Sequence, residues 1–339
     1  MYDIIHFFCI FAVMKTLLLQ LLILFFGISF CYGTENQDFP KEKYGVITVS
    51  VADARMEAKY SAEMGTQLLL GMPVQILKND GWWQIKTPED YVVWVEKSNF
   101  VRMTKEAFNQ WVNAKKVIFT DDYGFAYEAP DEKKQRVSDL VFGNLLKLEG
   151  ESKKFYYVSY PDGRKAYVSK KQATLYDKWK TSRKLTEKSI IETALTLKGI
   201  PYTWGGTSVK GMDCSGFTKT VFLKHGIILK RDAWQQAQTG IPVDISAGYD
   251  NLRPGDLMFF GRKATSETPE RIRHVAIYMG NKEFIHAAGL VKINSLDPSK
   301  PNYDELNTRE FLRATRIIGA VGSEGIQVID DISLYRVQE

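Results

Sequence analysis

Cysteine is scarce in this chain: its 339 residues include only Cys9, Cys31 and Cys214. The first two lie in an N-terminal segment that is expected to be removed, so an internal disulfide is excluded in the mature chain. Metal-binding spacings such as CxxC and HExxH are also absent. Cys214 is therefore either a small buried side chain or a reactive thiol, and zinc held by one cysteine and two histidines is an open alternative.

Long apolar runs are absent beyond the N-terminus, where residues 16–30 are predominantly apolar. A basic residue precedes this run, and Cys31 and Gly33 follow it at places where small residues precede a cleavage site. The pattern predicts a signal peptide over residues 1–33, with Met14 as a second candidate start and a retained membrane anchor as the alternative. No other stretch reaches the roughly 18 apolar residues of a spanning helix, so no stable membrane span is expected after cleavage.

The chain also lacks a strong excess of one charge. It has 45 Lys and Arg against 40 Asp and Glu, a net charge of +5 and a pI near 8.8. No run of basic residues stands out, so nucleic acid is not an expected partner. With 45% hydrophobic and 25% charged residues, the composition is that of a globular protein, and the length is typical of two or three domains.

Two segments repeat the same order of short apolar stretches, glycines and turn residues. The first spans residues 42–103 and the second residues 117–177. Gly143 follows Gly71 by 72 positions, and the other landmarks keep nearly the same offset. Short alternating strands broken by Gly, Pro and Asp predict two small β-barrels, and the pattern resembles bacterial SH3-like modules.

The rest of the chain reads as helices followed by strands. Residues 104–116 are predicted to form a helix that connects the two modules, with Thr104 as its N-cap. A basic connector over residues 178–184 precedes the last domain, residues 185–322. This domain is expected to open with a helix over residues 187–198 and to continue with a second helix and three strands. Helices followed by an antiparallel sheet indicate an α+β domain.

Cys214 stands where the second helix of this domain is predicted to begin, in the segment Asp213-Cys214-Ser215-Gly216. Asp213 can be the N-cap. A helix N-terminus carries a partial positive charge, which lowers the pKa of a thiol and favours the reactive thiolate. The free N–H groups of the first turn could also stabilise an oxyanion.

Histidine is nearly as scarce as cysteine, with four in the chain. His6 lies in the predicted signal peptide, and His225 ends the helix of the thiol, where a structural role is expected. His274 and His286 flank one predicted hairpin. A three-residue loop centred on Gly280, or an equivalent bulge, would place them directly opposite, with Cβ atoms roughly 5 Å apart. His274 is then the expected base for the thiol, and His286 its orienting partner.

Five motifs follow one another in the last domain: Tyr202-Thr-Trp-Gly-Gly-Thr207, Met212-Asp-Cys-Ser-Gly-Phe217, Leu252-Arg-Pro-Gly-Asp-Leu-Met-Phe-Phe260, His274-Val-Ala-Ile-Tyr-Met-Gly280 and Phe284-Ile-His-Ala287. In order and spacing they resemble the NlpC-type cell-wall cysteine peptidases. The resemblance implies a papain-like domain in which Cys214, His274 and His286 form the catalytic triad. It also implies hydrolysis of amide bonds in peptidoglycan stem peptides, with no metal and no cofactor.

The two modules before this domain make the chain similar to the γ-D-glutamyl-L-diamino-acid endopeptidases, also called dipeptidyl-peptidase VI. That resemblance implies cleavage after γ-D-Glu in peptides with a free N-terminal L-Ala, and a first module that closes one side of the cleft. Two departures are Ala233, where a serine is expected, and the charged stretch 262–273, which is either a lid or a surface insertion. The substrate-binding residues that the resemblance implies are Glu57, Tyr91, Trp204, Asp213, Ser215 and Asp232.

Two rival functions stay open at this point. One is an endopeptidase or amidase that acts on intact wall, and the other is a wall-binding protein whose modules act without turnover. The expected partner is a peptide L-Ala-γ-D-Glu-diamino acid, and the expected protein is a monomer exported to the periplasm or cell envelope. The sequence does not fix whether the diamino acid is lysine or diaminopimelate.

Overall fold

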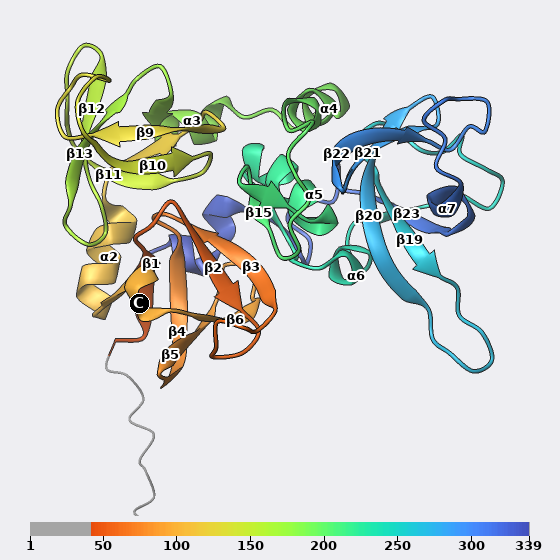
Figure 1. Ribbon diagram of the computed structural model, residues 1–339, viewed down its shortest axis with the longest axis horizontal. Coiled ribbons are helices and arrows are strands. Elements are labelled where there is room, and N and C mark those ends of the chain that lie inside the picture. The colour runs from red at the N-terminus through yellow and green to blue at the C-terminus, as the bar shows by residue number, and fades with distance from the viewer. Residues whose placement is uncertain (1–41, 339) are drawn as a thin grey trace, which may run out of the picture. The chain divides into compact units, whose positions relative to one another are not determined.

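The computed structural model describes residues 42–338 (Figure 1). The predicted signal peptide lies outside the described residues. Two seven-stranded antiparallel sheets come first and are followed by an α+β region, residues 185–338, with a six-stranded sheet. Within residues 42–338, no helix combines the length and the apolar character needed to cross a membrane.

The first sheet contains β1 (Tyr44–Ile47), β2 (Val51–Arg55), β3 (Met64–Leu69), β4 (Pro73–Asp80), β5 (Trp82–Lys86), β6 (Val92–Val95) and β7 (Phe100–Met103). Its strands lie in the order β3-β2-β6-β5-β4-β1-β7. Buried and partly exposed residues alternate along them, as in β5, where Trp83 and Ile85 are buried and their neighbours are not. Because the side chains alternate with a period of two residues, one face of each strand points into a common apolar core.

The second sheet repeats this topology as β10-β9-β13-β12-β11-β8-β14, which confirms the internal repeat. Gly71 and Gly143 lie in equivalent turns with φ of 80° and 86°, a left-handed conformation that glycine adopts without steric cost. The strands are β8 (Lys116–Phe119), β9 (Tyr123–Tyr127), β10 (Arg136–Val141), β11 (Leu145–Glu151), β12 (Phe155–Ser159), β13 (Lys165–Ser169) and β14 (Ala173–Leu175).

Neither sheet closes into a barrel, so the expectation of closed barrels is wrong. Within residues 42–338, β3 and β7 are the unpaired edges of the first sheet, and β10 and β14 are those of the second. The edge at β3 instead contacts the α+β region: the hydroxyl of Thr207 donates to the backbone carbonyl of Gln67, and the N–H of Thr207 donates to the side-chain Oε1 of Gln67, at 3.1 Å each. Covering an edge satisfies its backbone groups as closure would.

Two helices accompany the sheets. α2 (Lys105–Asn113) begins after Thr104, whose side chain accepts a hydrogen bond from the N–H of Ala107. Its buried residues Phe108 and Trp111 pack against the first sheet and against residues near the C-terminus. α3 (Tyr176–Ser182) follows β14 directly.

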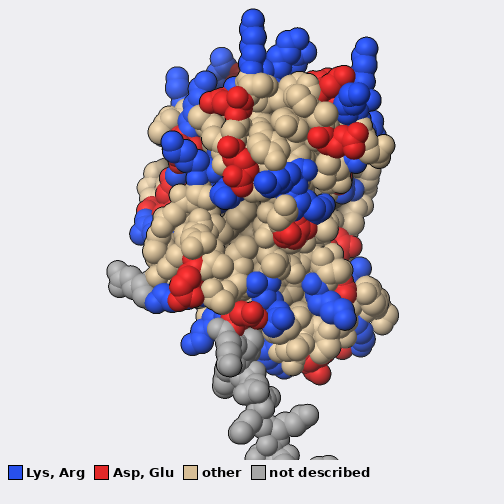
Figure 2. All heavy atoms as spheres, turned by 90° about the vertical axis from the view of Figure 1, so that its left-hand side faces the viewer, with Lys and Arg blue, Asp and Glu red and all other residues tan. Residues whose placement is uncertain are grey.

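Lysine and arginine side chains gather over the second sheet, at the top of Figure 2. They come from residues spread along the sequence, so the sequence contains no basic run that would predict this cluster. Acidic side chains lie among them, so the face is of mixed charge. The exposed basic residues of this sheet include Lys133, Lys134, Lys153, Lys154, Lys165 and Lys171.

In the α+β region, α5 (Cys214–Lys224) packs against one face of the six-stranded sheet, where Phe217 and Val221 share a core with Val275 and Ile277. α4 (Glu187–Thr196) begins with a capping box at Thr186. The sheet order is β18-β23-β19-β20-β21-β22. Its strands are β18 (Ile241–Val243), β19 (Leu257–Arg262), β20 (Arg271–Gly280), β21 (Glu283–Ala288), β22 (Leu290–Ser295) and β23 (Phe311–Arg316).

Shorter elements complete this region. β17 (Ile227–Leu229) pairs with β24 (Ile326–Val328), which brings the C-terminal residues back beside α5. The others are β15 (Thr207–Ser208), β16 (Gly211–Met212), α6 (Ala233–Gln236) and α7 (Glu305–Arg309).

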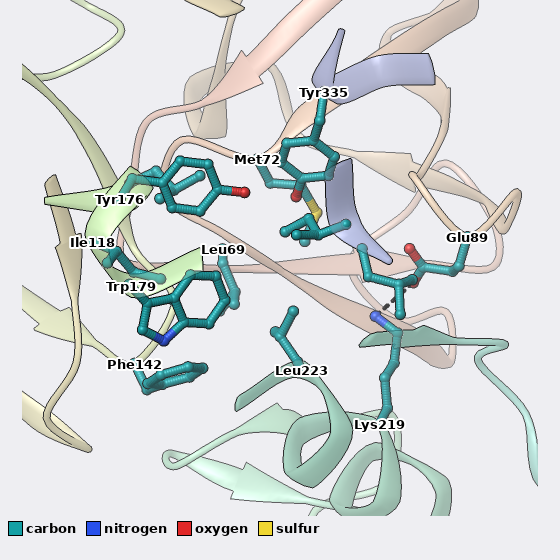
Figure 3. A pocket seen from close by; sticks show the side chains of 14 residues that line it. Leu69, Met72, Glu89, Ile118, Phe142, Tyr176, Trp179, Lys219, Leu223 and Tyr335 are labelled. Atoms are coloured by element: carbon teal, nitrogen blue, oxygen red, sulfur yellow. Dashed lines mark ion pairs between the residues drawn. The ribbon is translucent and has the colours of Figure 1, made fainter. Parts of the chain in front are cut away.

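A small buried hollow lies where the two sheets, α5 and the C-terminal residues meet (Figure 3). Its polar feature is an ion pair in which Nζ of Lys219 lies 2.8 Å from Oε1 of Glu89, both side chains being buried. Burial alone would raise the pKa of Glu89, but the charge and hydrogen bond of Lys219 bring that pKa below its ordinary value. Since Lys219 belongs to the helix that begins at Cys214, the pair links the first sheet to this helix.

Candidate active site

A cleft of about 450 Å³ lies between the first sheet and the α+β region. The first sheet contributes Met56, Glu63 and Tyr91 to its lining, and α5 contributes Cys214. Two segments far apart in the sequence therefore form one site. The other lining residues used below are Trp204, Asp213, Arg231, Asp232, Arg271 and Arg273.

Close backbone packing sets the position of α5. Asp213 is its N-cap: Oδ1 accepts from the N–H of Gly216 at 2.7 Å, and Oδ2 from the N–H of Gly205 at 3.0 Å. A Cβ on Gly216 would lie 1.9 Å from the carbonyl oxygen of Gly206, so only glycine permits this approach. These contacts explain why the glycines of the two motifs around the cysteine are needed.

Cys214 is the first residue of α5 and is 8% exposed. Burial, followed by the negative charge of Asp213, raises the pKa of its thiol to about 12, whereas the backbone N–H groups of Val275 and Ser215 act in the opposite direction. The expectation of a lowered pKa is therefore wrong for this state, because the loss of water around the sulfur outweighs the helix N-terminus. The resting side chain is a neutral thiol.

His274 and His286 are joined by a hydrogen bond of 2.7 Å between Nε2 of the first and Nδ1 of the second. Both rings are neutral near pH 7, since burial lowers the pKa of His274 to about 3 and that of His286 to about 4. Nε2 of His286 lies 3.0 Å from Oδ1 of Asn294, whose Nδ2 donates to the carbonyl of Asn302. An amide oxygen only accepts, so the network assigns the proton of His286 to Nε2 and makes its Nδ1 an acceptor. His274 then donates from Nε2, and its Nδ1 carries a free lone pair.

The hairpin brings the two rings together through a register that differs from the expected one. β20 and β21 pair Ile277 with Ile285 and have a bulge just before the turn, so the expected bulge is present. Continued along the strands, this register places His286 opposite Ala276, two residues from His274. Direct opposition is therefore wrong, but a shift of two residues keeps both rings on the same face of the sheet.

The thiol and the imidazole pair are neighbours without a direct bond. The backbone N–H of Val275, the residue after His274, acts to lower the pKa of the thiol. Between Cys214 and the ring of His274, both within the described part of the chain, the structure has no hydrogen bond. Contacts of this kind often tighten only when substrate binds.

Arg231 was missed at the sequence level, although it is almost fully buried behind the thiol. Its Nη2 lies 2.7 Å from Oδ2 of Asp213, and its Nη1 donates to Oγ of Ser215 at 3.0 Å. The carboxylate of Asp213 is therefore already compensated by a protein cation, and the hydroxyl of Ser215 is held in the same cluster. In the sequence it is one of two adjacent basic residues, Lys230 and Arg231, after a short apolar stretch, and this pattern does not distinguish it.

The remaining expected residues fall on the two walls of the cleft. Tyr91 donates from its hydroxyl to Oδ1 of Asp232 at 3.3 Å, across the boundary between the first sheet and the α+β region. Burial raises the pKa of Asp232, and it also raises that of Tyr91. Trp204 is exposed at the mouth and donates from Nε1 to Oε1 of Glu63 at 2.6 Å.

Among the expected substrate-binding residues, Glu57 is the one that does not line this cleft. Its side chain is exposed and forms an ion pair of 2.7 Å with Lys59. Glu63, six positions later, lines the cleft instead. The turn before β3 decides which of the two carboxylates faces inward, and local sequence carries no signal for that choice.

Asn294 was also missed. It lies on β22 and pairs with Phe284 of the neighbouring strand, so only the strand register brings it to the histidines. Metal coordination was the remaining chemical alternative; residues 42–338 contain no cluster of three His, Cys, Asp or Glu side chains suited to a metal ion.

An α+β domain with a thiol at a helix N-terminus and a hydrogen-bonded imidazole pair on the adjacent sheet is the architecture of the papain-like thiol hydrolases. Comparison with known families specifies the group: residues 199–310 match the NlpC/P60 family, and residues 55–100 match the bacterial dipeptidyl-peptidase Sh3 domain. The chain thus contains an NlpC/P60 peptidase domain preceded by an SH3 domain of the dipeptidyl-peptidase type.

Similar proteins extend over most of the chain. A gamma-D-glutamyl-L-lysine dipeptidyl-peptidase of Bacillus cereus is 29% identical over 75% of this chain and 76% of its own length. Dipeptidyl-peptidase 6 of Lysinibacillus sphaericus is 28% identical over 82% of this chain and 98% of its own length. The crystal structure of an NlpC/P60 family protein from Bacillus cereus covers 80% of this chain and 99% of its own, with a TM-score of 0.68 and 26% identity.

Proposed function

We propose that this protein is a cysteine endopeptidase that hydrolyses the bond between γ-D-Glu and a diamino acid in peptidoglycan stem peptides with a free N-terminal L-Ala. The observation that carries the proposal is the two-walled cleft, in which carboxylates from the first sheet and from the α+β region face the same space as Cys214. The names of the two similar dipeptidyl-peptidases support this substrate class.

In this proposal Cys214 is the nucleophile, His274 the base and His286 the residue that orients the base. Since both partners are neutral at rest, the thiol gives its proton to Nδ1 of His274 as the sulfur attacks the γ-carbonyl carbon of D-Glu. The free lone pair on Nδ1 is the acceptor. N–H groups at the start of α5 then stabilise the oxyanion.

Collapse of the tetrahedral species breaks the C–N bond, and the imidazolium of His274 protonates the leaving amine of the diamino acid. A thioester of L-Ala-γ-D-Glu remains on Cys214. Water attacks this thioester while His274 takes its proton, which returns the thiol and releases the dipeptide.

The free amine of L-Ala is recognised by carboxylates. Within residues 42–338, Asp232 and Glu63 are the cleft carboxylates that form no ion pair, although the charge of Arg231 acts on Asp232, whereas Asp213 is paired directly with Arg231. Tyr91 holds Asp232 in place, and Trp204 holds Glu63. An ammonium group pairs strongly with carboxylates in a narrow cleft, and a peptide without it leaves them unpaired. Ser215 accepts a hydrogen bond from Arg231 and so helps to position that arginine. Glu57 does not contact the substrate in this mechanism.

Asn294 fixes the tautomer that this mechanism needs. Asn294→Leu removes the acceptor for Nε2 of His286 and should lower kcat about 10- to 100-fold with little change in KM. Asn294→Asp keeps an acceptor and should retain more activity than the leucine variant. Steady-state kinetics on a defined tripeptide measure both, and an unchanged kcat in a folded leucine variant would remove Asn294 from the account.

We further propose a location for the protein and a division of the chain into domains. The protein acts as a monomer, exported to the periplasm or cell envelope, where such peptides arise. The parts are a signal peptide over residues 1–33, SH3-like modules over residues 42–103 and 117–177, a connecting segment over residues 104–116 whose helix α2 spans Lys105–Asn113, and the peptidase domain over residues 185–322.

Product analysis tests the function directly. Purified protein is incubated with L-Ala-γ-D-Glu-L-Lys or with the diaminopimelate peptide, and the products are identified by mass spectrometry. The expected products are L-Ala-γ-D-Glu and the free diamino acid. Equal cleavage of the same peptides embedded in intact wall, where the amine is blocked, would instead indicate a wall endopeptidase.

A further inference from the structure

Three arginines line the cleft, and two of them are already paired. Arg231 is held by Asp213, and Arg273 forms an ion pair with Glu310. Arg271 is exposed to solvent in the cleft and makes no hydrogen bond or ion pair within residues 42–338. In this part of the chain it is therefore the cleft arginine with an available guanidinium.

A second arginine stands beside it. The register of β19 and β20 places Arg262 directly opposite Arg271, so the two side chains leave the sheet on the same face. Like charges in this relation repel each other. The nearby acid Glu270 does not relieve them, since it pairs with Arg313. Arg262 does not line the cleft, but its charge adds to that of Arg271 beside it, so an anion bound at Arg271 would be stabilised.

The cleft therefore has two kinds of charged wall. Asp232 and Glu63 are acidic, and Arg271 is basic, with the thiol of Cys214 opening into the same space. The proposed substrate carries a matching pair of charges: the ammonium of L-Ala and the free α-carboxylate of D-Glu, whose γ-carbonyl is the group attacked. Planar guanidinium groups bind carboxylates through two parallel hydrogen bonds.

The position of the base decides which part of the substrate meets Arg271. His274, which protonates the leaving amine, does not line this cleft, whereas Cys214 does. The acyl part of the substrate therefore occupies the cleft, and the diamino acid departs on the side of the histidines. Of the substrate carboxylates, the one on D-Glu is on the acyl part.

We propose that Arg271, supported by the charge of Arg262, binds the α-carboxylate of the D-Glu residue and makes the enzyme select peptides in which that carboxylate is free over those in which it is amidated. This inference rests on the proposed function and adds a specificity determinant to it. The group bound by Arg271 is a carboxylate, and the other substrate residue that could supply a carboxylate is the diamino acid.

The test compares four peptides: L-Ala-γ-D-Glu-X and its α-carboxamide analogue, L-Ala-γ-D-isoglutaminyl-X, with X as L-Lys or diaminopimelate. The unaltered enzyme should prefer the carboxylate form by about 10- to 100-fold in kcat/KM. Arg271→Gln should lose that preference by losing activity on the carboxylate form alone, and Arg271→Lys should keep part of it. Lys263→Ala removes a charge from the same hairpin outside the cleft and should behave as the unaltered enzyme.

The outcomes separate the two proposals. Hydrolysis of the carboxylate and carboxamide forms at equal rates by the unaltered enzyme overturns the role of Arg271 and leaves the endopeptidase function intact. No hydrolysis of any peptide overturns the function itself. If Arg271→Gln changes only the ratio between lysine and diaminopimelate peptides, the arginine reads the leaving residue, and the assignment to D-Glu is wrong.

Discussion

Replacement of Cys214 by alanine should lower kcat/KM for L-Ala-γ-D-Glu-L-Lys by about 10⁴-fold or more while the chain stays folded. Ser215, the next residue along α5, does not replace the thiol, since its hydroxyl is held by Asp213 and Arg231. Removing one sulfur atom from the start of α5 leaves its capping contacts in place. Steady-state kinetics give the loss, and circular dichroism and thermal unfolding confirm the fold.

The two kinds of histidine provide a matched control for this result. His274→Ala should bring a loss of similar size, because the thiol then has no acceptor for its proton. His225 is also buried, but its ring bonds to the hydroxyl of Thr193 and the carbonyl of Lys184. It therefore takes no part in the proposed proton transfer. His225→Gln should therefore leave kcat within a few fold of the unaltered enzyme and affect stability instead. Full activity in the Cys214 variant would contradict the account.

Acetylation of the substrate's N-terminal amine should lower kcat/KM by about 100-fold or more. The acetylated peptide has no positive charge, so it leaves the carboxylates of Asp232 and Glu63 without the partner that the free amine supplies. Asp232→Asn should produce a similar loss on the free peptide and little further loss on the acetylated one. A wall endopeptidase would cleave both peptides equally well.

KM for the peptide with a free N-terminal amine should depend on pH. Burial raises the pKa of Asp232, so its carboxylate is protonated at a higher pH than usual as the solution becomes acidic. KM for the free peptide should therefore rise as the pH falls toward this pKa, and the rise should be absent in Asp232→Asn. A KM that is independent of pH in the unaltered enzyme would show that Asp232 does not bind the amine.

Features set by a few neighbouring residues could be predicted from the sequence. Thr104 and Asp213 cap their helices as expected because an N-cap interaction spans only three residues. The repeat of the two sheets was visible because strands alternate with a period of two and glycines recur where positive φ is needed, as at Gly71 and Gly143. The expected bulge in the hairpin followed from the same local reasoning.

Features that depend on long-range packing could not be predicted from the sequence. Arg231 and Asn294 reach the site through the arrangement of strands, not through any local pattern. The raised pKa of Cys214 results from burial by residues distant in sequence, which no helix-end argument includes. The choice of Glu63 over Glu57 depends on how one turn of the first sheet meets the α+β region. In the first sheet, the contact at the β3 edge is also long-range, since the hydroxyl of Thr207 donates to the backbone carbonyl of Gln67.

Mass spectrometry of the intact protein during turnover tests the central claim most directly. When the enzyme is mixed with L-Ala-γ-D-Glu-L-Lys and quenched in acid, a fraction of the chains should carry an L-Ala-γ-D-Glu adduct, and peptide mapping should place it on Cys214 as a thioester. Hydrolysis that proceeds with no adduct on this residue, or with an adduct on another side chain, would contradict the account.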